Sequence, residues 1–466
     1  MKKHPFAYTL LALCQLGQTQ NLIQDSLAGI VPSCSDTIEK MPFEGMDLTW
    51  QNGNDRREAP VLVGKYFVGN VMVDANYTYS FNNPIDNTVV GSTALARNNE
   101  MEVSCASLGG EFNYKGARGR VFTQFGTRST VIPRNDFSPY RGQYQLANMY
   151  RYLSEAYGGY HWNKWYGINV DVGMFMSYIG LNSYYQVENW EYQASYTSDN
   201  TPWFFNGMRI QIFPSKTVKI EPWIINGWQS YGKFNEMPGF GGNITWCPKE
   251  SIKLLTNDYY GADAAGLPGR KRFHSDNSLL IRYFNQPKSN GISKVAFSLT
   301  ADIGFENGGG VKPFKDDSAA GYRAQNFLSM MFYHRIWFHK NKFAWTIGGG
   351  AMTNPGRYLV LYPTGDASPL PNPNNPTTTE GTHPFSANPG DKFSGWDCST
   401  NLDWMPNQSI TFRIEYVHRQ ASVDYFAGRG GVTSPTGYTT TTLPPTWKPD
   451  LVKTEDRIIF VMLFRI

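Results

Sequence analysis

Residues 457–466 read "RIIFVMLFRI", an apolar run with an arginine near each end. The run is too short for a membrane-spanning helix, which needs about 20 apolar residues, and too apolar for a free chain end. In an extended strand, successive side chains point to opposite faces. One face is then wholly apolar: Ile458, Phe460, Met462, Phe464 and Ile466. The other face carries Arg457, Ile459, Val461, Leu463 and Arg465. The run therefore predicts a strand with one face against lipid.

The same alternation recurs along the chain. It is clear in "YGINVDVGMFM" (166–176), "KVAFSLTADIGFE" (294–306) and "SITFRIEYVHR" (409–419), where apolar residues alternate with charged or small polar ones. Each run is close to the 9–11 residues that a tilted transmembrane strand requires. These runs indicate strands that separate lipid from a polar interior.

We count sixteen such strands, joined by connections that are alternately short and long. The short connections, such as "KGAR" and "HKNK", have turn chemistry. The expected strands are 66–82, 102–114, 117–127, 151–162, 165–176, 204–213, 217–229, 237–247, 250–260, 272–285, 292–306, 325–338, 342–353, 393–405, 408–421 and 454–466. An even number of strands with alternating loop lengths is typical of bacterial outer-membrane barrels. The fold class is therefore all-β: a transmembrane antiparallel up-and-down β-barrel of about 16 strands, with short periplasmic turns and long external loops.

A closed barrel leaves no unpaired strand edge in lipid. We therefore expect residues 454–466 to pair with the first strand, near residues 67–81. Soluble sandwiches and propellers also use alternating strands. They bury their apolar faces, however, and no 40- to 50-residue repeat typical of a propeller is visible.

The composition excludes several functional classes. A net charge of +4 without a lysine-rich block argues against nucleic acid as a partner. No GxSxG, HExxH or phosphate-loop motif occurs, so we expect no catalytic residues, no metal ligands and no cofactor. Aromatic residues make up 15% of a chain whose mean hydropathy is −0.42. That pairing suits a barrel with aromatic girdles and a polar lumen.

The N-terminus begins with two lysines and a short apolar run, "MKKHPFAYTLLALC", which resembles a signal peptide. We divide the chain into a signal peptide (1–20), an N-terminal periplasmic segment (21–65) and an outer-membrane β-barrel (66–466). The expected location is the outer membrane of a Gram-negative bacterium.

Several loose motifs carry a family resemblance. They include "ENWEYQASY" (188–196), the Pro-x-x-x-x-Gly-x-Arg pattern of Pro202 to Arg209, "NGW" (226–228) and the hairpin "GGNITWCPKESIKLLTNDYYG" (241–261). With these the chain resembles the β-barrel porins of the OmpL-like type from about residue 60 onward. The resemblance implies an outer-membrane channel without catalytic residues, and it identifies no solute.

Charges on the polar strand faces should line the lumen, because a charged side chain facing lipid at mid-depth costs about 2–4 kcal/mol. The predicted pore-lining residues are Glu111, Arg118, Arg120, Asp171, Arg209, Lys219, Glu221, Arg282, Asp302, Arg335, Arg413 and Glu415. Both signs of charge are present, which predicts modest ion selectivity.

The long loop 177–203 is the candidate constriction loop. Its acids are Glu188, Glu191 and Asp199, and its aromatic residues include Tyr185 and Trp190. One hypothesis folds this loop into the lumen, with the acids opposing Arg118 and Arg120. The alternative is an exposed aromatic loop.

The predicted function is passive diffusion of small polar solutes or ions. Two alternatives stay open: a solute-specific porin, for example one that stacks sugars on the aromatic loop, and a binding or adhesion role for long loops such as 363–384 and 433–449. Expected partners are outer-membrane lipid, the barrel-assembly machinery and small polar solutes. A homotrimer is a further expectation, since trimers are common among sixteen-stranded porins.

Overall fold

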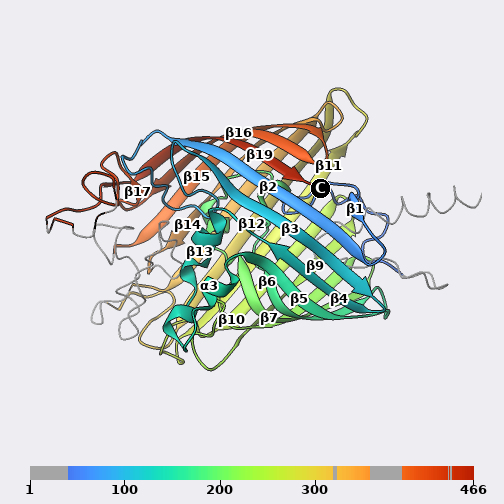
Figure 1. Ribbon diagram of the computed structural model, residues 1–466, viewed down its shortest axis with the longest axis horizontal. Helices are drawn as coiled ribbons and strands as arrows, with labels where there is room; N and C mark the ends of the chain where they lie inside the picture. Colours follow the sequence, from blue (N-terminus) through green and yellow to red (C-terminus); the bar gives the residue numbers. More distant parts are fainter. Residues whose placement is uncertain (1–39, 318–322, 357–390, 439, 441–442, 445) are drawn as a thin grey trace, which may run out of the picture.

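The computed structural model describes residues 40–317, 323–356, 391–438, 440, 443–444 and 446–466, and these residues form one closed antiparallel barrel (Figure 1). Within them the barrel consists of sixteen strands, β2–β16 and β19. Their bounds are β2 Phe67–Ser80, β3 Met101–Tyr114, β4 Ala117–Thr123, β5 Leu153–Trp162, β6 Ile168–Met176, β7 Phe204–Ser215, β8 Val218–Ile225, β9 Gly239–Lys249, β10 Ile252–Gly261, β11 Lys271–Asn285, β12 Ile292–Asn307, β13 Asn326–Phe338, β14 Phe343–Asn354, β15 Phe393–Asn407, β16 Ile410–Ala421 and β19 Thr454–Arg465. The predicted fold class and strand number are confirmed.

Strand β19 closes the barrel by pairing with β16 on one side and with β2 on the other. Its residue Phe460 lies opposite Tyr77 of β2. Beyond the strand, Ile466 and Val71 exchange two backbone hydrogen bonds of 2.9 Å. The C-terminal run thus supplies the partner that the first strand needs, as its alternation indicates.

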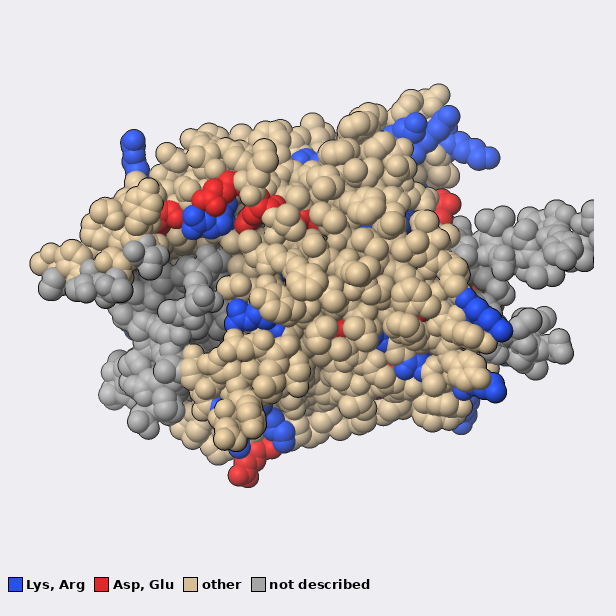
Figure 2. All heavy atoms as spheres, in the orientation of Figure 1, with Lys and Arg blue, Asp and Glu red and all other residues tan. Residues whose placement is uncertain are grey.

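The two faces of β19 differ as the sequence predicts. Phe460 is 49% exposed on the outside, whereas its neighbours Ile459 and Val461 are buried on the inside. Figure 2 shows the result for the whole molecule: a broad outer surface with only scattered charged spots, and projecting charged side chains chiefly near the two ends. Such a surface suits a hydrocarbon environment.

Short strands and helical turns lie outside the sixteen barrel strands. Strand β1 (Leu62–Val63) adds to β2, and β17 (Phe426–Ala427) pairs with β18 (Leu451–Val452) in a long loop. The helical turns α2 (Arg128–Val131), η3 (Ile132–Asn135), η4 (Ser138–Tyr140) and α3 (Leu146–Tyr150) lie in the loop after β4, and η5 (Gln186–Glu188) and α4 (Tyr196–Asp199) lie in the loop after β6. No helix in the described part of the chain is long and apolar enough to cross a membrane.

Two strands are shorter than the alternation predicts. Strand β4 ends at Thr123 instead of residue 127, and β8 ends at Ile225 instead of residue 229. After β4 the chain turns at Gly126, whose φ is +118°. A Cβ there would lie 2.5 Å from the carbonyl oxygen of Val103, so only glycine allows this close passage. Alternating side chains alone did not reveal where the backbone leaves the sheet.

The segment before the barrel packs against it. The predicted periplasmic segment (21–65) stays a prediction, and much of its part at 41–57 is buried at the short-turn end of the barrel, the end that carries the C-terminus in Figure 1. The backbone N–H of Phe43 donates to the carbonyl of Lys216 at 2.8 Å, and Trp50 Nε1 donates to the carbonyl of Glu250 at 2.9 Å. Both acceptors belong to short turns. The predicted signal peptide (1–20) and the loop 363–384 lie outside the described residues.

Candidate pore

All twelve predicted pore-lining charges lie on inward faces of their strands. Eleven are buried and Glu111 is half-buried: the buried ones are Arg118, Arg120, Asp171, Arg209, Lys219, Glu221, Arg282, Asp302, Arg335, Arg413 and Glu415. Because an ionised side chain facing lipid is costly, only the lumen can hold this many charges.

Most of these charges are paired with neighbours on adjacent strands. On one side of the barrel, Arg120 contacts Glu155 at 3.0 Å and also Glu111. Asp171 accepts from Arg209 at 3.0 Å and lies 3.5 Å from Arg118. Such pairs fix the side chains along the wall and partly neutralise one another's charge.

Loop 177–203 folds into the lumen and lies against the opposite side. The carboxylate of Glu415 accepts the backbone N–H groups of Tyr192 at 2.6 Å and Gln193 at 2.8 Å. Arg335 donates to the carbonyl of Trp190 at 3.1 Å. Arg413 donates to the carbonyl of Asn189 at 3.0 Å. The strand charges that we assigned to the pore here bind the backbone of the loop instead.

The acids of the loop have other partners than we predicted. Glu188 pairs with Arg465, Glu191 accepts from Asn182, and Asp199 lies 3.0 Å from Arg419. The prediction that all three oppose Arg118 and Arg120 therefore does not describe their contacts. Arg118 and Arg120 pair instead with carboxylates of nearby strands on their own side of the barrel, because those strands bring acids closer to them than the loop does.

Burial raises the pKa values of two acidic side chains in the loop. It raises the pKa of Glu191 to about 7, because the hydrogen bond from Asn182 and the charge of Arg413 only partly offset the loss of water. Burial also raises the pKa of Glu188, against the opposing effect of Arg465. In the N-terminal segment, burial alone would raise the pKa of Asp55, but Arg465 and Arg57 outweigh it and hold that pKa below its usual value.

The aromatic side chains of the loop are buried against the barrel rather than exposed. The hydroxyl of Tyr185 donates to Glu155 at 2.7 Å, and that of Tyr192 donates to Asp74 at 2.7 Å. The ring of Trp190 meets that of Trp337 edge-on, with centroids 5.5 Å apart. These rings anchor the loop, and their faces are largely occupied by protein.

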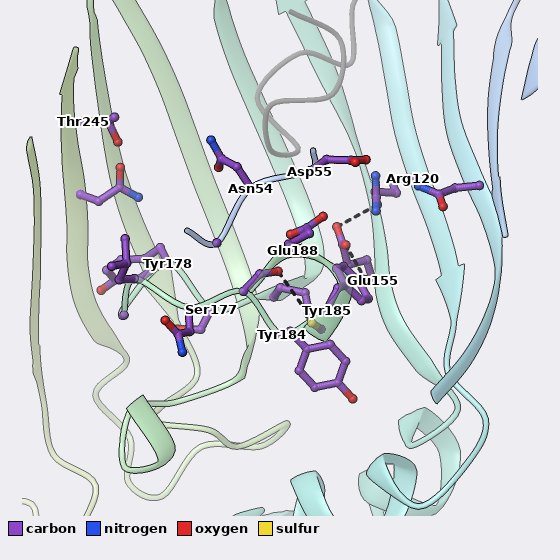
Figure 3. Close-up of a pocket in the computed structure, with 18 of the residues that line it drawn as sticks. Asn54, Asp55, Arg120, Glu155, Ser177, Tyr178, Tyr184, Tyr185, Glu188 and Thr245 are labelled. Atoms are coloured by element: carbon purple, nitrogen blue, oxygen red, sulfur yellow. Dashed lines mark hydrogen bonds and ion pairs between the residues drawn. The ribbon is translucent and has the colours of Figure 1, made fainter. Parts of the chain in front are cut away.

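A cavity of about 150 Å³ remains between the loop and the wall formed by β2–β10, with Arg465 of β19 at its edge, in the half of the barrel nearer the short turns. Figure 3 shows Asp55, Arg120 and Glu188 pointing toward this space, each from a different part of the chain. Its charged lining is Asp55, Arg57, Glu111, Arg120, Glu155, Glu188, Arg209, Lys219, Glu221, Lys253 and Arg465.

Five of the twelve predicted pore residues thus line the cavity: Glu111, Arg120, Arg209, Lys219 and Glu221. Three others, Arg335, Arg413 and Glu415, hold the loop. Arg118 and Asp171 lie 3.5 Å apart and do not line the cavity. The last two lie elsewhere in the lumen: Arg282 contacts Asp47 at 2.7 Å, and Asp302 lies 3.4 Å from His274.

Sequence reasoning missed Asp55 and Arg57, which reach the cavity from the N-terminal segment. A signal for them exists in the preceding residues, "MPFEGMDLTW" (41–50), which carry more large apolar side chains than a solvated periplasmic segment needs. In the described parts of the chain, no group of three or more His, Cys, Asp and Glu residues is placed to hold a metal ion.

Comparison with known families matches residues 69–450 to the family described as "Putative beta-barrel porin-2, OmpL-like". The chain belongs to this porin family. It is an outer-membrane porin of a Gram-negative bacterium, and the family is one of channels rather than enzymes. No curated protein matches the chain.

Solved structures with a similar arrangement are also outer-membrane barrels. The outer-membrane channel DcaP of Acinetobacter baumannii is 10% identical, with a TM-score of 0.46 and coverage of 86% of this porin and 97% of that chain. An anion-selective porin from Comamonas acidovorans is 7% identical, with a TM-score of 0.48 and coverage of 86% and 99%. OprD of Pseudomonas aeruginosa is 7% identical, with a TM-score of 0.34 and coverage of 86% and 95%.

Proposed function

We propose that small polar solutes and ions cross this porin by passive diffusion along the wall formed by β2–β10, through the cavity beside loop 177–203. The observation that supports this route is where the middle of the loop backbone is held. The backbone groups of Asn189, Trp190, Tyr192 and Gln193 are hydrogen-bonded to β13 and β16, and the cavity lies between the loop and the wall of β2–β10.

The charge of the lining supports weak ion selectivity. It comprises six basic residues (Arg57, Arg120, Arg209, Lys219, Lys253 and Arg465) and five acidic ones (Asp55, Glu111, Glu155, Glu188 and Glu221). Nearly balanced charge of this kind gives a solute of either sign both attractive and repulsive contacts along the route.

Single-channel conductance of the refolded protein in a planar bilayer, with a salt gradient across it, tests the proposal. We expect discrete, stable steps and a small reversal potential. A heat-modifiable barrel that inserts into the bilayer and carries no current would contradict it. The homotrimer and the contact with the assembly machinery stay predictions, and the mass of the detergent-extracted particle tests the first.

A further inference from the structure

The N-terminal segment 41–57 meets the constriction loop inside the lumen. We propose that this segment is a latch, which holds loop 177–203 in place and completes the constriction, so that it sets the size of the passage. The inference rests on the proposed function, because it concerns the same route.

The latch is held by the barrel at the short-turn end. Asp47 accepts from Arg282 at 2.7 Å and lies 3.5 Å from Lys294. At the other end of the segment, Arg56 donates to the carbonyls of Asn407 at 2.9 Å and Ile410 at 2.6 Å. Contacts near the ends of two separate hairpins, β11–β12 and β15–β16, fix the segment across the opening of the barrel.

Between these anchors five hydrogen bonds join the latch to the loop. Asn52 Nδ2 donates two of them, to Asn182 Oδ1 at 3.3 Å and to the carboxylate of Glu191 at 3.5 Å. The backbone N–H of Trp190 donates to Asn52 Oδ1 at 2.8 Å, and its indole Nε1 donates to the carbonyl of Trp50 at 3.1 Å. In return, the N–H of Gly53 donates to the carbonyl of Glu188 at 3.1 Å. Trp50 and Asn52 are 1% and 0% exposed, so these bonds are shielded from water. Each therefore costs more to break than a surface bond would.

The latch also forms part of the cavity wall. Gly53, Asn54, Asp55 and Arg57 line the cavity together with Glu188 of the loop. Asp55 joins the two, because it pairs with Arg57 at 2.7 Å and lies 3.3 Å from Arg465, which itself pairs with Glu188. Movement of the latch would therefore move both the wall and the loop acid that faces the passage.

Gly53 is the point of closest approach. Its φ is +77°, and a Cβ built on it would lie 2.1 Å from the carbonyl oxygen of Leu181 in the loop. Gly45 offers a matched control, since its φ is +74° and a Cβ there meets nothing within 4 Å. Alanine imposes similar backbone strain at both positions, but only at Gly53 does it force the latch away from the loop.

The experiment compares Gly53→Ala with Gly45→Ala in the full chain, by single-channel conductance and by limited trypsin cleavage after Arg56 and Arg57. We expect Gly53→Ala to raise the unit conductance and to expose these sites, while Gly45→Ala behaves like the unaltered porin. An Asn52→Ala variant, which removes the three side-chain hydrogen bonds of Asn52 to the loop without backbone strain, should act in the same direction.

Two outcomes overturn the latch. One is a Gly53→Ala protein that matches Gly45→Ala in both conductance and cleavage. The other is cleavage without any change in conductance, since the segment would then be loosened without affecting the passage. If all variants and the unaltered protein carry no current, the proposed route fails, and the trypsin comparison alone decides whether the segment is held against the loop.

Discussion

The two sides of the barrel interior carry similar inward-facing charges and use them differently. On the side of β13–β16, Arg335, Arg413 and Glu415 bind the backbone of loop 177–203. On the side of β2–β10, Arg120 and Lys219 pair with acids on their own or neighbouring strands and line a cavity. An inward-facing charge therefore either binds the loop or lines the cavity, and the position of loop 177–203 decides which.

The strongest test of the loop-covered side is Asp403→Ala. The Asp403 carboxylate is fully buried and accepts from both Arg335 at 2.6 Å and Arg413 at 2.6 Å. Its removal leaves two buried guanidinium groups without this partner, which should cost about 3–5 kcal/mol of unfolding free energy. Urea unfolding of the protein refolded in lipid vesicles measures the change.

The control for that substitution is Glu100→Ala, which breaks the exposed pair with Arg97. Exposed pairs contribute about 0–1 kcal/mol. Equal losses of unfolding free energy for the two substitutions would show that burial on the loop-covered side does not increase the contribution of an ion pair to stability.

The second prediction concerns pH. The pKa of Glu191 in the folded loop, about 7, lies above its ordinary value of 4.5. The folded state therefore retains a proton that the unfolded chain releases, and stability should fall as pH rises from about 4.5 to 7, by about 3 kcal/mol from this group. Glu191→Gln should remove that slope. Parallel curves of unfolding free energy against pH for the two proteins would contradict the assignment.

A smaller effect is expected for Glu415→Ala, which leaves the N–H groups of Tyr192 and Gln193 without their acceptor. A hydrogen bond to a charged group contributes about 1.5–3 kcal/mol. We expect the loop to loosen while the barrel stays closed. Chymotrypsin cleavage near Tyr192 should increase, with unchanged heat-modifiability, and a resistant loop would show that this anchor is dispensable.

The smallest effects are expected on ion preference, and they separate the two sides most directly. Glu188→Gln should shift the reversal potential toward anions and Lys219→Gln toward cations, because both side chains line the cavity. One charge about 4 Å from an ion in water is worth about 1 kcal/mol, roughly a fivefold change in the ion ratio. Glu191→Gln should leave the reversal potential unchanged, since Glu191 accepts from Asn182 and does not line the cavity. A shift equal to that of Glu188→Gln would place the passage on the wrong side of the loop.

The strands could be predicted because lipid imposes a strict rule on every second residue. Ile458, Phe460 and Met462 had to face outward, and Arg457 and Arg465 had to face inward, whatever the rest of the chain did. The sixteen strands and their connections follow from the same rule. Where β4 leaves the sheet depends instead on the close passage at Gly126, which no alternation encodes.

The lumen was less predictable because its contacts depend on which distant segments meet. The pairing of Glu188 with Arg465 joins a loop to the last strand, and the bond from Trp190 to Asn52 joins the loop to the segment before the barrel. Neither pair has a spacing in the sequence that would suggest it. The apolar residues at 41–50 were the one available sign that the N-terminal segment is buried.

The pairing of β19 with β2 also affects the order in which the parts of the barrel fold. It brings together residues such as Asn70 and Arg465, which are 395 positions apart in the sequence and joined by a hydrogen bond of 3.2 Å. The fourteen strands between them can form hairpins with near neighbours, but this seam requires the two ends of the sheet to find each other. The seam should be the slowest part of the barrel to form, and until it does, two open strand edges remain free to pair with other chains.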